Sequence, residues 1–493
     1  MLNLDLLPLL IGTVVECVRV YNCQAPLVRL TFPYRPLVAS EGPQAFDLDR
    51  DGKDEFFITF DSAGRVDALR YDDDEDGATD RIYRLRNYGN ERVPHVVILL
   101  DSVPFQRVAE RYSAGEFRWF DPPTKVIAPF PSMTEVCYTE LLHAPPMRGM
   151  IEQHYDRRAR RMHNGIWDRT FNGYKHPWER ALHYRARYSE EGFGYLDPRS
   201  WYRAELERAR RALDQNPDRV TLVYLTSSAG MACKYGRAGV DEVLDGAAQL
   251  CLQLLYERRG ALKISMMADH GHNLVRSRNI DVAKLLRDGG FRVAKRLERP
   301  DDVVLELCGL VTYAAARTTK PARVAERLLT HSGIEFAMYL EQDRVVVRDA
   351  RGTAVIECHD ERFRYRVLTS DVFGYESIRS NLPADADGFV ARDDWFAATV
   401  DHEYPDAPPS VWDAFHSRVI DPPEVMFTTR DGFYAGDPSF ERFITMQSTH
   451  GSLNQRNTAT FLMSMTGRVR APLRTRDVMP AIEPSWRPGV IRG

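Results

Sequence analysis

Three short segments of this chain are apolar at nearly every position, a pattern typical of strands buried on both faces of a parallel sheet. They lie at residues 96–100 (VVILL) and within residues 219–228 (RVTLVYLTSS) and 261–271 (ALKISMMADHG). Patterns with helical spacing follow two of them, at residues 239–259 and 278–291. This alternation predicts an α/β fold with a doubly wound, mostly parallel sheet flanked by helices.

Two other stretches have periodic patterns that predict further elements. Residues 333–368 alternate between apolar and polar positions, with turn signals at EQD and DARG, and therefore predict a small antiparallel insertion. Residues 198–215 repeat with helical spacing and predict an amphipathic helix with a charged outer face.

These patterns divide the 493 residues into four expected regions. They are a β-rich N-terminal extension with two acidic loops (1–90), an α/β core with a cap segment (91–290), an insertion or lid that is partly antiparallel (291–440), and a return to the core with the C-terminal tail (441–493).

The composition excludes several classes of protein. The chain is 44% hydrophobic with a formal net charge of -4, which gives no basic footprint for nucleic acid. No apolar run reaches the roughly 20 residues that a transmembrane helix needs. The seven cysteines have no CxxC spacing, so they indicate neither a zinc knuckle nor a disulfide framework. The apolar run at residues 1–17 fits either a remnant of a signal peptide or an ordinary buried segment.

Two acidic segments share the pattern D-x-D-x-D-G-x-x-[DE], at residues 47–55 (first acidic loop) and 72–80 (second acidic loop). The glycine permits a sharp bend, and alternate carboxylates then lie on one side of the turn, where their hard oxygens suit calcium. The other reading is an acidic hairpin turn. Both loops resemble the short calcium loops of FG-GAP and related extracellular repeats, and neither has the twelfth-position carboxylate of an EF-hand. The candidate ligands of a structural calcium ion are Asp47, Asp49, Asp51 and Glu55 in the first loop and Asp72, Asp74, Asp76 and Asp80 in the second.

Polar side chains follow two of the predicted buried strands. Asp101 ends the first strand, and Asp269 and His270 follow the third. In doubly wound sheets, ligands bind beyond the carboxyl ends of the strands. We therefore expect chemistry at these three residues.

Two further candidates lie in loops. Ser132 and Glu135 have the spacing of a capping box, which would place Thr134 in the first turn of a helix, where free N–H groups favour an anion. His450 lies in a glycine-containing loop before an apolar segment. Each has an ordinary alternative, namely a locally bonded threonine and a satisfied histidine.

Four motifs occur in an order that resembles the alkaline phosphatase superfamily, and most closely its type I phosphodiesterase/nucleotide pyrophosphatase branch. The motifs are Asp101, Thr134, Asp269-His270-Gly271 and His450-Gly451. The resemblance covers about residues 93–467, and FPSMTEVCYTELLHA follows the nucleophile region of the branch position by position. It implies that Thr134, rather than Ser102 or Ser132, is the nucleophile.

The resemblance further implies a hydrolase of phosphoric esters with two metal ions and a small-molecule phosphate ester as substrate. One zinc ion would be held by Asp101, Thr134, Asp269 and His270. Zinc accepts carboxylate oxygen and imidazole nitrogen and lowers the pKa of a bound hydroxyl, so Thr134 would need no separate base. Other divalent metals stay open.

The second zinc site departs from the branch. The branch supplies an Asp and a His from Asp-x-x-Gly-His-x-Tyr-Gly together with the last histidine, whereas residues 229–236 here read AGMACKYG. Ala229 and Cys233 replace the expected pair, and His450 is kept. Two readings follow: a rebuilt site with Cys233 and His450 as zinc ligands, or an impaired protein that binds a phosphate ester or a metal. His272 is an additional imidazole nearby.

Residues 150–188 are rich in arginine and aromatic side chains that suit phosphate and a stacked base or headgroup, although a cap over the sheet explains them equally. The aromatic candidates are Trp167, Phe171, Tyr174 and Trp178. The calcium-type loops and the resemblance favour an extracytoplasmic location, periplasmic or secreted, and the N-terminus leaves a cytoplasmic location open. Nothing in the sequence indicates the oligomeric state.

Overall fold

The computed structural model describes most of the chain between residues 42 and 486. The described residues are 42–48, 51–85, 93–151, 154–163, 175–187, 190, 194–215, 220–307, 309, 311–436, 445–467, 469, 471–484 and 486. They form two compact units. The described parts of Ile127–Trp178 and His270–Ala459 make up the antiparallel unit, and those of residues 42–126, Glu179–Asp269 and residues 460–486 make up the mixed-sheet unit.

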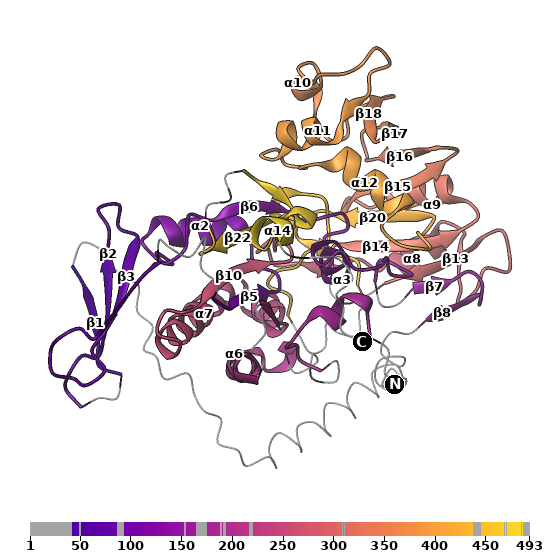
Figure 1. The fold of residues 1–493 in the computed structure, drawn as a ribbon. Coiled ribbons are helices and arrows are strands. Elements are labelled where there is room, and N and C mark those ends of the chain that lie inside the picture. The colour runs from indigo at the N-terminus through magenta and orange to yellow at the C-terminus, as the bar shows by residue number, and fades with distance from the viewer. Residues whose placement is uncertain are drawn as a thin grey trace. The chain divides into compact units, whose positions relative to one another are not determined.

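The mixed-sheet unit contains a six-stranded sheet with the order β23-β6-β22-β10-β5-β9 (Figure 1). Its strands are β5 (His95–Leu100), β6 (Thr124–Ile127), β9 (Val220–Leu225), β10 (Lys263–Ala268), β22 (Ala459–Ser464) and β23 (Leu473–Arg474). The three apolar runs form β5, β9 and β10 as predicted, and β5 pairs with both neighbours in parallel.

The prediction of a mixed α/β fold is confirmed, but the expected mostly parallel sheet is not what the structure shows. Strand β22 pairs with β10 in the antiparallel direction although all of its residues are buried. An unbroken apolar run reports burial on both faces and carries no information about strand direction. The other sheets are also largely antiparallel.

Helices cover the strands of this sheet. They are α2 (Phe105–Ser113), α6 (Pro198–Gln215), α7 (Ser227–Glu257) and α14 (Thr475–Ile482). Helix α7 follows β9 and packs against α6, the helix predicted from its amphipathic pattern. At Gly236 (φ 57°, ψ -133°) the backbone of α7 leaves the helical region, so α7 consists of two helical segments joined at a kink.

The same unit contains the β-rich N-terminal extension. Its four antiparallel strands are β1 (Gln44–Phe46), β2 (Phe56–Phe60), β3 (Val66–Tyr71) and β4 (Arg81–Arg84). The first acidic loop connects β1 to β2, and the second connects β3 to β4. The hydroxyl of Tyr71 in β3 donates a hydrogen bond to the carbonyl of Leu255 in α7 over 2.8 Å, which ties this small sheet to α7.

The antiparallel unit is built on a nine-stranded sheet with the order β12-β13-β14-β20-β15-β16-β17-β18-β19. The strands are β12 (Arg292–Val293), β13 (Asp302–Glu306), β14 (Tyr313–Thr318), β15 (Ile334–Glu341), β16 (Arg344–Arg348), β17 (Thr353–His359), β18 (Arg362–Val367), β19 (Val390–Ala391) and β20 (Val425–Thr429). The predicted meander is confirmed as β15 to β18, but it is part of a sheet much larger than the small insertion expected.

The two faces of this sheet bury separate cores, as the period of two requires. In β14, Tyr313 and Ala315 belong to one core with helix α12, whereas Ala314 and Ala316 belong to the other with helices α8 and α9. The helices of the unit are α3 (Thr134–Leu141), α8 (Val282–Asp288), α9 (Pro321–Leu328), α10 (Glu376–Arg379), α11 (Arg392–Thr399), α12 (Ala407–His416) and α13 (Gln455–Thr458).

The remaining elements are short. They are β7 (His154–Asp156), β8 (Arg161–His163), β11 (Arg278–Asn279), β21 (Phe433–Tyr434) and the 3-10 helix η4 (Pro177–Ala181). In the described parts of the chain, none of the helices has the length and apolar character needed to span a membrane.

Candidate metal centre

Two aspartates lie at the carboxyl ends of neighbouring parallel strands of the mixed-sheet unit. Asp101 follows β5 and Asp269 follows β10, and both side chains are buried. Asp101 Oδ1 accepts a hydrogen bond from Ser102 Oγ, and Oδ2 accepts one from the hydroxyl of Tyr224, each over 2.6 Å. These bonds fix the orientation of the carboxylate.

The turn after β5 has an uncommon backbone conformation. Ser102 has φ 65°, in the left-handed region that a serine seldom occupies. In this conformation its N–H donates to Asp269 Oδ1 over 3.1 Å, while the N–H of Asp101 donates to Ser228 Oγ over 2.7 Å. The strained turn therefore positions both carboxylates. No sequence pattern pointed to the supporting hydroxyls of Tyr224 and Ser228.

His270 is the residue directly after Asp269 in the chain. Asp101, Asp269 and His270, which we call the buried triad, each offer a ligand atom, and these three atoms lie within 4.8 Å of one another. His270 Nδ1 is 2.9 Å from the carbonyl of Gly271, which requires the proton on Nδ1. Nε2 therefore carries the lone pair that a metal would use.

Thr134 is the first residue of α3 in the antiparallel unit, as predicted, and its Oγ1 lies 3.4 Å from His270 Nε2. The predicted capping box is wrong. Met133, in an extended conformation, precedes the helix, and no side chain caps it. Ser132 lies one residue too early, and its buried hydroxyl donates to the carbonyl of Ser452 over 3.0 Å.

Two glycines of the predicted motifs are required by the backbone. A Cβ atom on Gly271 would lie 2.4 Å from the carbonyl oxygen of Arg456. Gly451 has φ 122°, which side chains rarely allow, and a Cβ there would be 3.0 Å from the backbone nitrogen of Tyr313. Glycine at these positions permits the close packing that places His270 and His450.

Three histidines of the antiparallel unit form a buried cluster. The rings of His270 and His450 stack with centroids 3.9 Å apart, and the ring of His272 is 5.4 Å from that of His450. His450 Nδ1 lies 3.0 Å from the carbonyl of Ser132, so Nε2 carries the lone pair in His450 as well. Burial, and then the positive charges that His450 and His270 would carry, lower the pKa of His272 well below its usual value. The imidazole of His272 is therefore neutral, the form that binds metals.

Ala229 and Cys233 lie in the first segment of α7 and are buried. Burial, together with the charge of Asp101, raises the pKa of the Cys233 thiol far above its usual value. The thiol is therefore protonated, and zinc binds the thiolate. This part of α7 thus offers neither the carboxylate nor the imidazole that the resemblance required.

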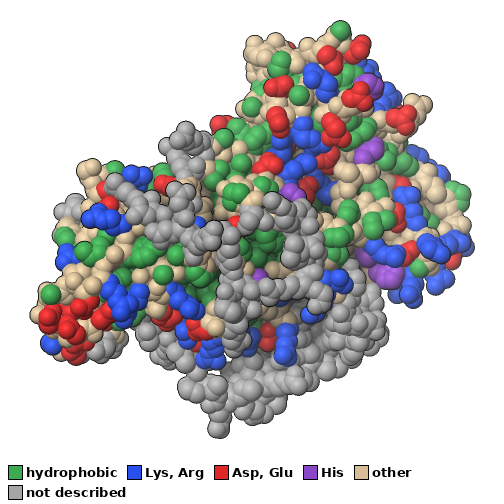
Figure 2. Space-filling model, viewed as in Figure 1, with side chains coloured by type: hydrophobic (Ala, Val, Ile, Leu, Met, Phe, Trp, Pro, Cys, Tyr) green, Lys and Arg blue, Asp and Glu red, His purple; other side chains and the backbone are tan. Residues whose placement is uncertain are grey.

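The second acidic loop brings three of its four predicted ligands together. Asp72, Asp74 and Asp80, which we call the exposed triad, offer ligand atoms within 4.8 Å of one another. Asp74 and Asp80 are exposed, whereas Asp72 is buried; Asp76 is outside the group. Figure 2 shows acidic side chains gathered over the loops beside β1 and β3.

The first acidic loop shows no such group in the part that the structure describes. Asp47, Asp51 and Glu55 accept hydrogen bonds from backbone N–H groups of their own loop. Asp49 lies outside the described residues.

Other candidates from the sequence have no site around them or cannot be placed. Trp178 is buried and packs against Tyr138 with ring centroids 5.1 Å apart, so it offers no surface for stacking a substrate. Trp167, Phe171, Tyr174, Cys17, Cys23 and Cys308 lie outside the described residues. The described cysteines form no disulfide.

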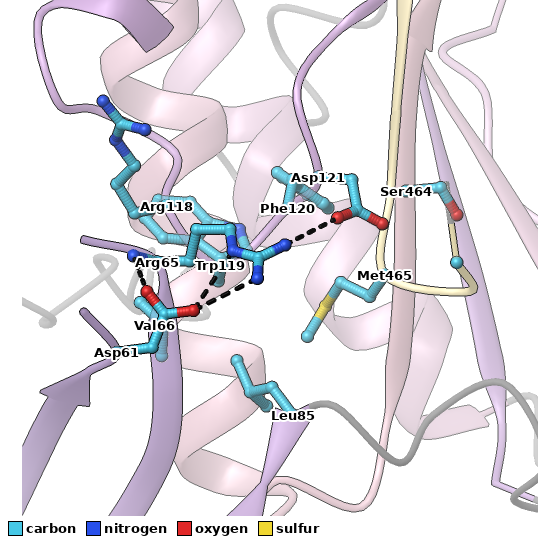
Figure 3. Close-up of a pocket in the computed structure, with 11 residues that line it drawn as sticks. Asp61, Arg65, Val66, Leu85, Arg118, Trp119, Phe120, Asp121, Ser464 and Met465 are labelled. Carbon is cyan, nitrogen blue, oxygen red and sulfur yellow. Dashed lines mark hydrogen bonds and ion pairs between the residues drawn. The ribbon is translucent and has the colours of Figure 1, made fainter. Parts of the chain in front are cut away.

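The mixed-sheet unit has a cavity of about 310 Å³, with none of the predicted site residues in its lining (Figure 3). Arg65 extends between two carboxylates, 3.2 Å from Asp61 and 3.7 Å from Asp121. The two carboxylates neutralise Arg65, and much of the remaining lining is apolar. The carboxylates of this cavity are therefore paired with Arg65.

Comparisons with known proteins leave the family open. No family model matches the chain, and neither does any curated protein. Phosphonoacetate hydrolase from Sinorhizobium meliloti 1021 is similar in structure, with a TM-score of 0.43 both in complex with phosphonoformate (10% identity) and in complex with phosphonoacetate (9% identity). Each match covers 83% of this chain and 98% of the other. A likeness this remote carries no argument about the chemistry of this chain.

Proposed function

We propose that this chain is a metal-dependent hydrolase of phosphoric esters, of the phosphodiesterase or phosphatase type found in the alkaline phosphatase superfamily. The observation that carries the proposal is the buried triad, with the hydroxyl of Thr134 3.4 Å from the metal-facing nitrogen of His270. The proposed substrate class is a small-molecule phosphate ester, and the proposed location is extracytoplasmic.

The donors of this site suit zinc. Two carboxylates, one imidazole and one hydroxyl form a mixed oxygen and nitrogen set, and the buried surroundings exclude bulk water. Bound zinc would lower the pKa of the threonine hydroxyl and polarise a phosphoryl oxygen. Asp101, Asp269, His270 and Thr134 are the residues proposed to hold it.

Each of the residues around the site has its own role in the proposed reaction. Thr134 Oγ1, after giving its proton to water, would form a bond to phosphorus while the bond from phosphorus to the leaving oxygen breaks, and the departing alkoxide would take up a proton from water. Water would then hydrolyse the phosphothreonine, which regenerates the Thr134 hydroxyl and releases the phosphate or phosphate monoester. The first-turn N–H groups of α3 face the anionic phosphoryl group. Tyr224 and Ser102 keep Asp101 in place, and the carbonyl of Gly271 keeps His270 in the required tautomer.

We place the altered second metal position at His450 and His272. Burial disfavours the thiolate of Cys233, whereas the imidazole of His272 is neutral and lies beside that of His450. Two histidines and water molecules would hold a metal more weakly than the buried triad, because no carboxylate supplies negative charge.

A second candidate function is binding of a phosphate ester without turnover. The absence of a ligand at Ala229 and the protonated thiol of Cys233 favour it, because the half of the site that would activate water for the release of phosphate is weakened.

The experiment is hydrolysis of bis-p-nitrophenyl phosphate and p-nitrophenyl phosphate by the zinc-loaded protein. Thr134→Ala should lower kcat/KM by at least about 1,000-fold. Thr139→Ala is the matched control, because this threonine of the same helix donates its hydroxyl to the carbonyl of Glu135 and should leave activity within about threefold.

Mass spectrometry separates the two functions. A phosphate attached to Thr134 after incubation with substrate supports the hydrolase. Unchanged ester and no phosphorylated residue, with the ester bound equally well by Thr134→Ala, would support the binding protein instead.

A further inference from the structure

The exposed triad is a second group of potential metal ligands, and it lies in a different sequence region from the buried triad. Asp72, Asp74 and Asp80 come from the loop between β3 and β4. Their ligand atoms lie within 4.8 Å of one another, a separation at which three carboxylates repel each other without a cation.

Asp72 provides an independent observation, because its side chain is 97% buried (3% exposed). Oδ2 accepts the N–H of Gly77 over 2.9 Å, but the buried Oδ1 has no hydrogen-bond partner. Within the described part of the chain, Asp72 also forms no ion pair. A buried carboxylate oxygen without a donor or a cation is costly, so this oxygen indicates a missing positive ligand.

The neighbouring cations are paired with other acids of the loop. Arg81 and Arg259 bind Asp73 over 3.1 and 2.9 Å. Lys53 lies 3.7 Å from Glu75. The arginines and lysine therefore compensate the flanking charges and leave those of the triad for a different cation.

We propose that Asp72, Asp74 and Asp80 bind a calcium ion. All the side-chain donors are hard oxygens, and the site offers no nitrogen or sulfur that would favour zinc. Water completes the coordination at the exposed side, where Asp74 and Asp80 face solvent. The site does not depend on the proposed hydrolase activity.

The loop is connected to α7, which gives the ion a structural effect. Asp73 binds Arg259, just beyond the end of α7, and the guanidinium of Arg259 lies 5.0 Å from the ring centre of Tyr71. Calcium that orders the loop therefore also holds β3 and β4 against this end of α7. Binding should stabilise the mixed-sheet unit.

Calcium alone is the probe, added to full-length protein that has been stripped of metals with EGTA, freed of the chelator and reloaded with zinc. We expect Tm to rise by about 3 °C at saturating calcium, and magnesium to give a much smaller shift. Asp72→Asn and Asp80→Asn should abolish the calcium shift. Asp67→Asn, which removes the same charge from β3, should keep it.

The test does not depend on the folding of a variant at a buried position. If Asp72→Asn does not fold, Asp80→Asn still decides the question because its side chain faces solvent. The proposal is overturned if calcium does not shift the wild-type Tm, if Asp80→Asn retains the full shift, or if Asp47→Asn in the first acidic loop abolishes it while Asp80→Asn does not.

Discussion

The described part of the chain contains two groups of three potential metal ligands with the same spacing and opposite surroundings. In the buried triad, all three side chains are inaccessible, and one donor is an imidazole nitrogen. In the exposed triad, all three donors are carboxylates, and two of them face solvent. Spacing alone therefore does not separate a catalytic site from a structural one.

The difference lies in the supporting contacts. Hydroxyls of Ser102 and Tyr224 and the carbonyl of Gly271 fix the buried triad in a water-poor site, as an electrophilic metal requires. The exposed triad is held mainly by N–H groups of its own loop. Such a loop suits an ion that exchanges with solvent.

The largest effect is expected when a ligand is removed from the buried triad. Asp269→Asn removes a negative charge and a metal-binding oxygen, so zinc affinity should fall and hydrolysis of bis-p-nitrophenyl phosphate should drop by at least about 1,000-fold. Calcium binding should be unchanged. A variant that keeps both zinc and activity would show that the buried triad is not the metal site.

Selective chelation should separate the two groups in the wild-type protein. Phenanthroline, which prefers zinc, should abolish hydrolysis, and added zinc should restore it. Removing all metals with EGTA, washing out the chelator and returning zinc without calcium should lower Tm by about 3 °C and leave activity largely intact. Loss of activity that only calcium reverses would contradict the assignment.

A smaller effect is expected at the second metal position. His272→Asn removes an imidazole beside His450 and should lower kcat by about 10- to 100-fold, with partial recovery at high zinc concentration. Exposed His359→Asn is the control. An unchanged zinc dependence would place His272 outside the metal site.

The smallest effect concerns a buried acid that belongs to neither group. Burial raises the pKa of Glu335 to about 7, although the hydroxyl of Tyr404 donates to its Oε1 over 2.9 Å. Because the folded pKa is raised, this residue's contribution to stability is complete below pH 4.5 and is lost as the pH rises through 7.

Glu335→Gln mimics the protonated acid. It should therefore have little effect at pH 4.5 and stabilise the protein by about 2 kcal/mol at pH 8, as measured by urea unfolding at both pH values. Equal effects at the two pH values would mean that Glu335 is ionised throughout this range.

Part of the fold could be predicted from the sequence, because a strand that is buried on both faces leaves an almost unbroken apolar run. The runs that form β5, β9 and β10 are apolar at nearly every position, and the acids after β5 and β10 stand at the strand ends as expected. The direction of β22 and the role of Ser132 could not be predicted, since both depend on partners far away in the chain.

The candidate site could also be predicted only in part. The motif residues were identifiable, but the hydroxyl of Tyr224 that holds Asp101 and the burial that keeps Cys233 protonated depend on the tertiary structure. In the second acidic loop, the spacing suggested four equivalent ligands, whereas packing buries Asp72 and leaves Asp76 out of the group.

The most direct test of the central claim, that the two triads hold different metals, is the metal content of three proteins after dialysis in zinc and calcium. Mass spectrometry should find both metals in the wild type. Asp269→Asn should keep calcium and lose the zinc of the buried triad. Asp80→Asn should keep zinc and lose the calcium of the exposed triad. Loss of the same metal from both variants, or a wild type that holds neither metal, would contradict the account.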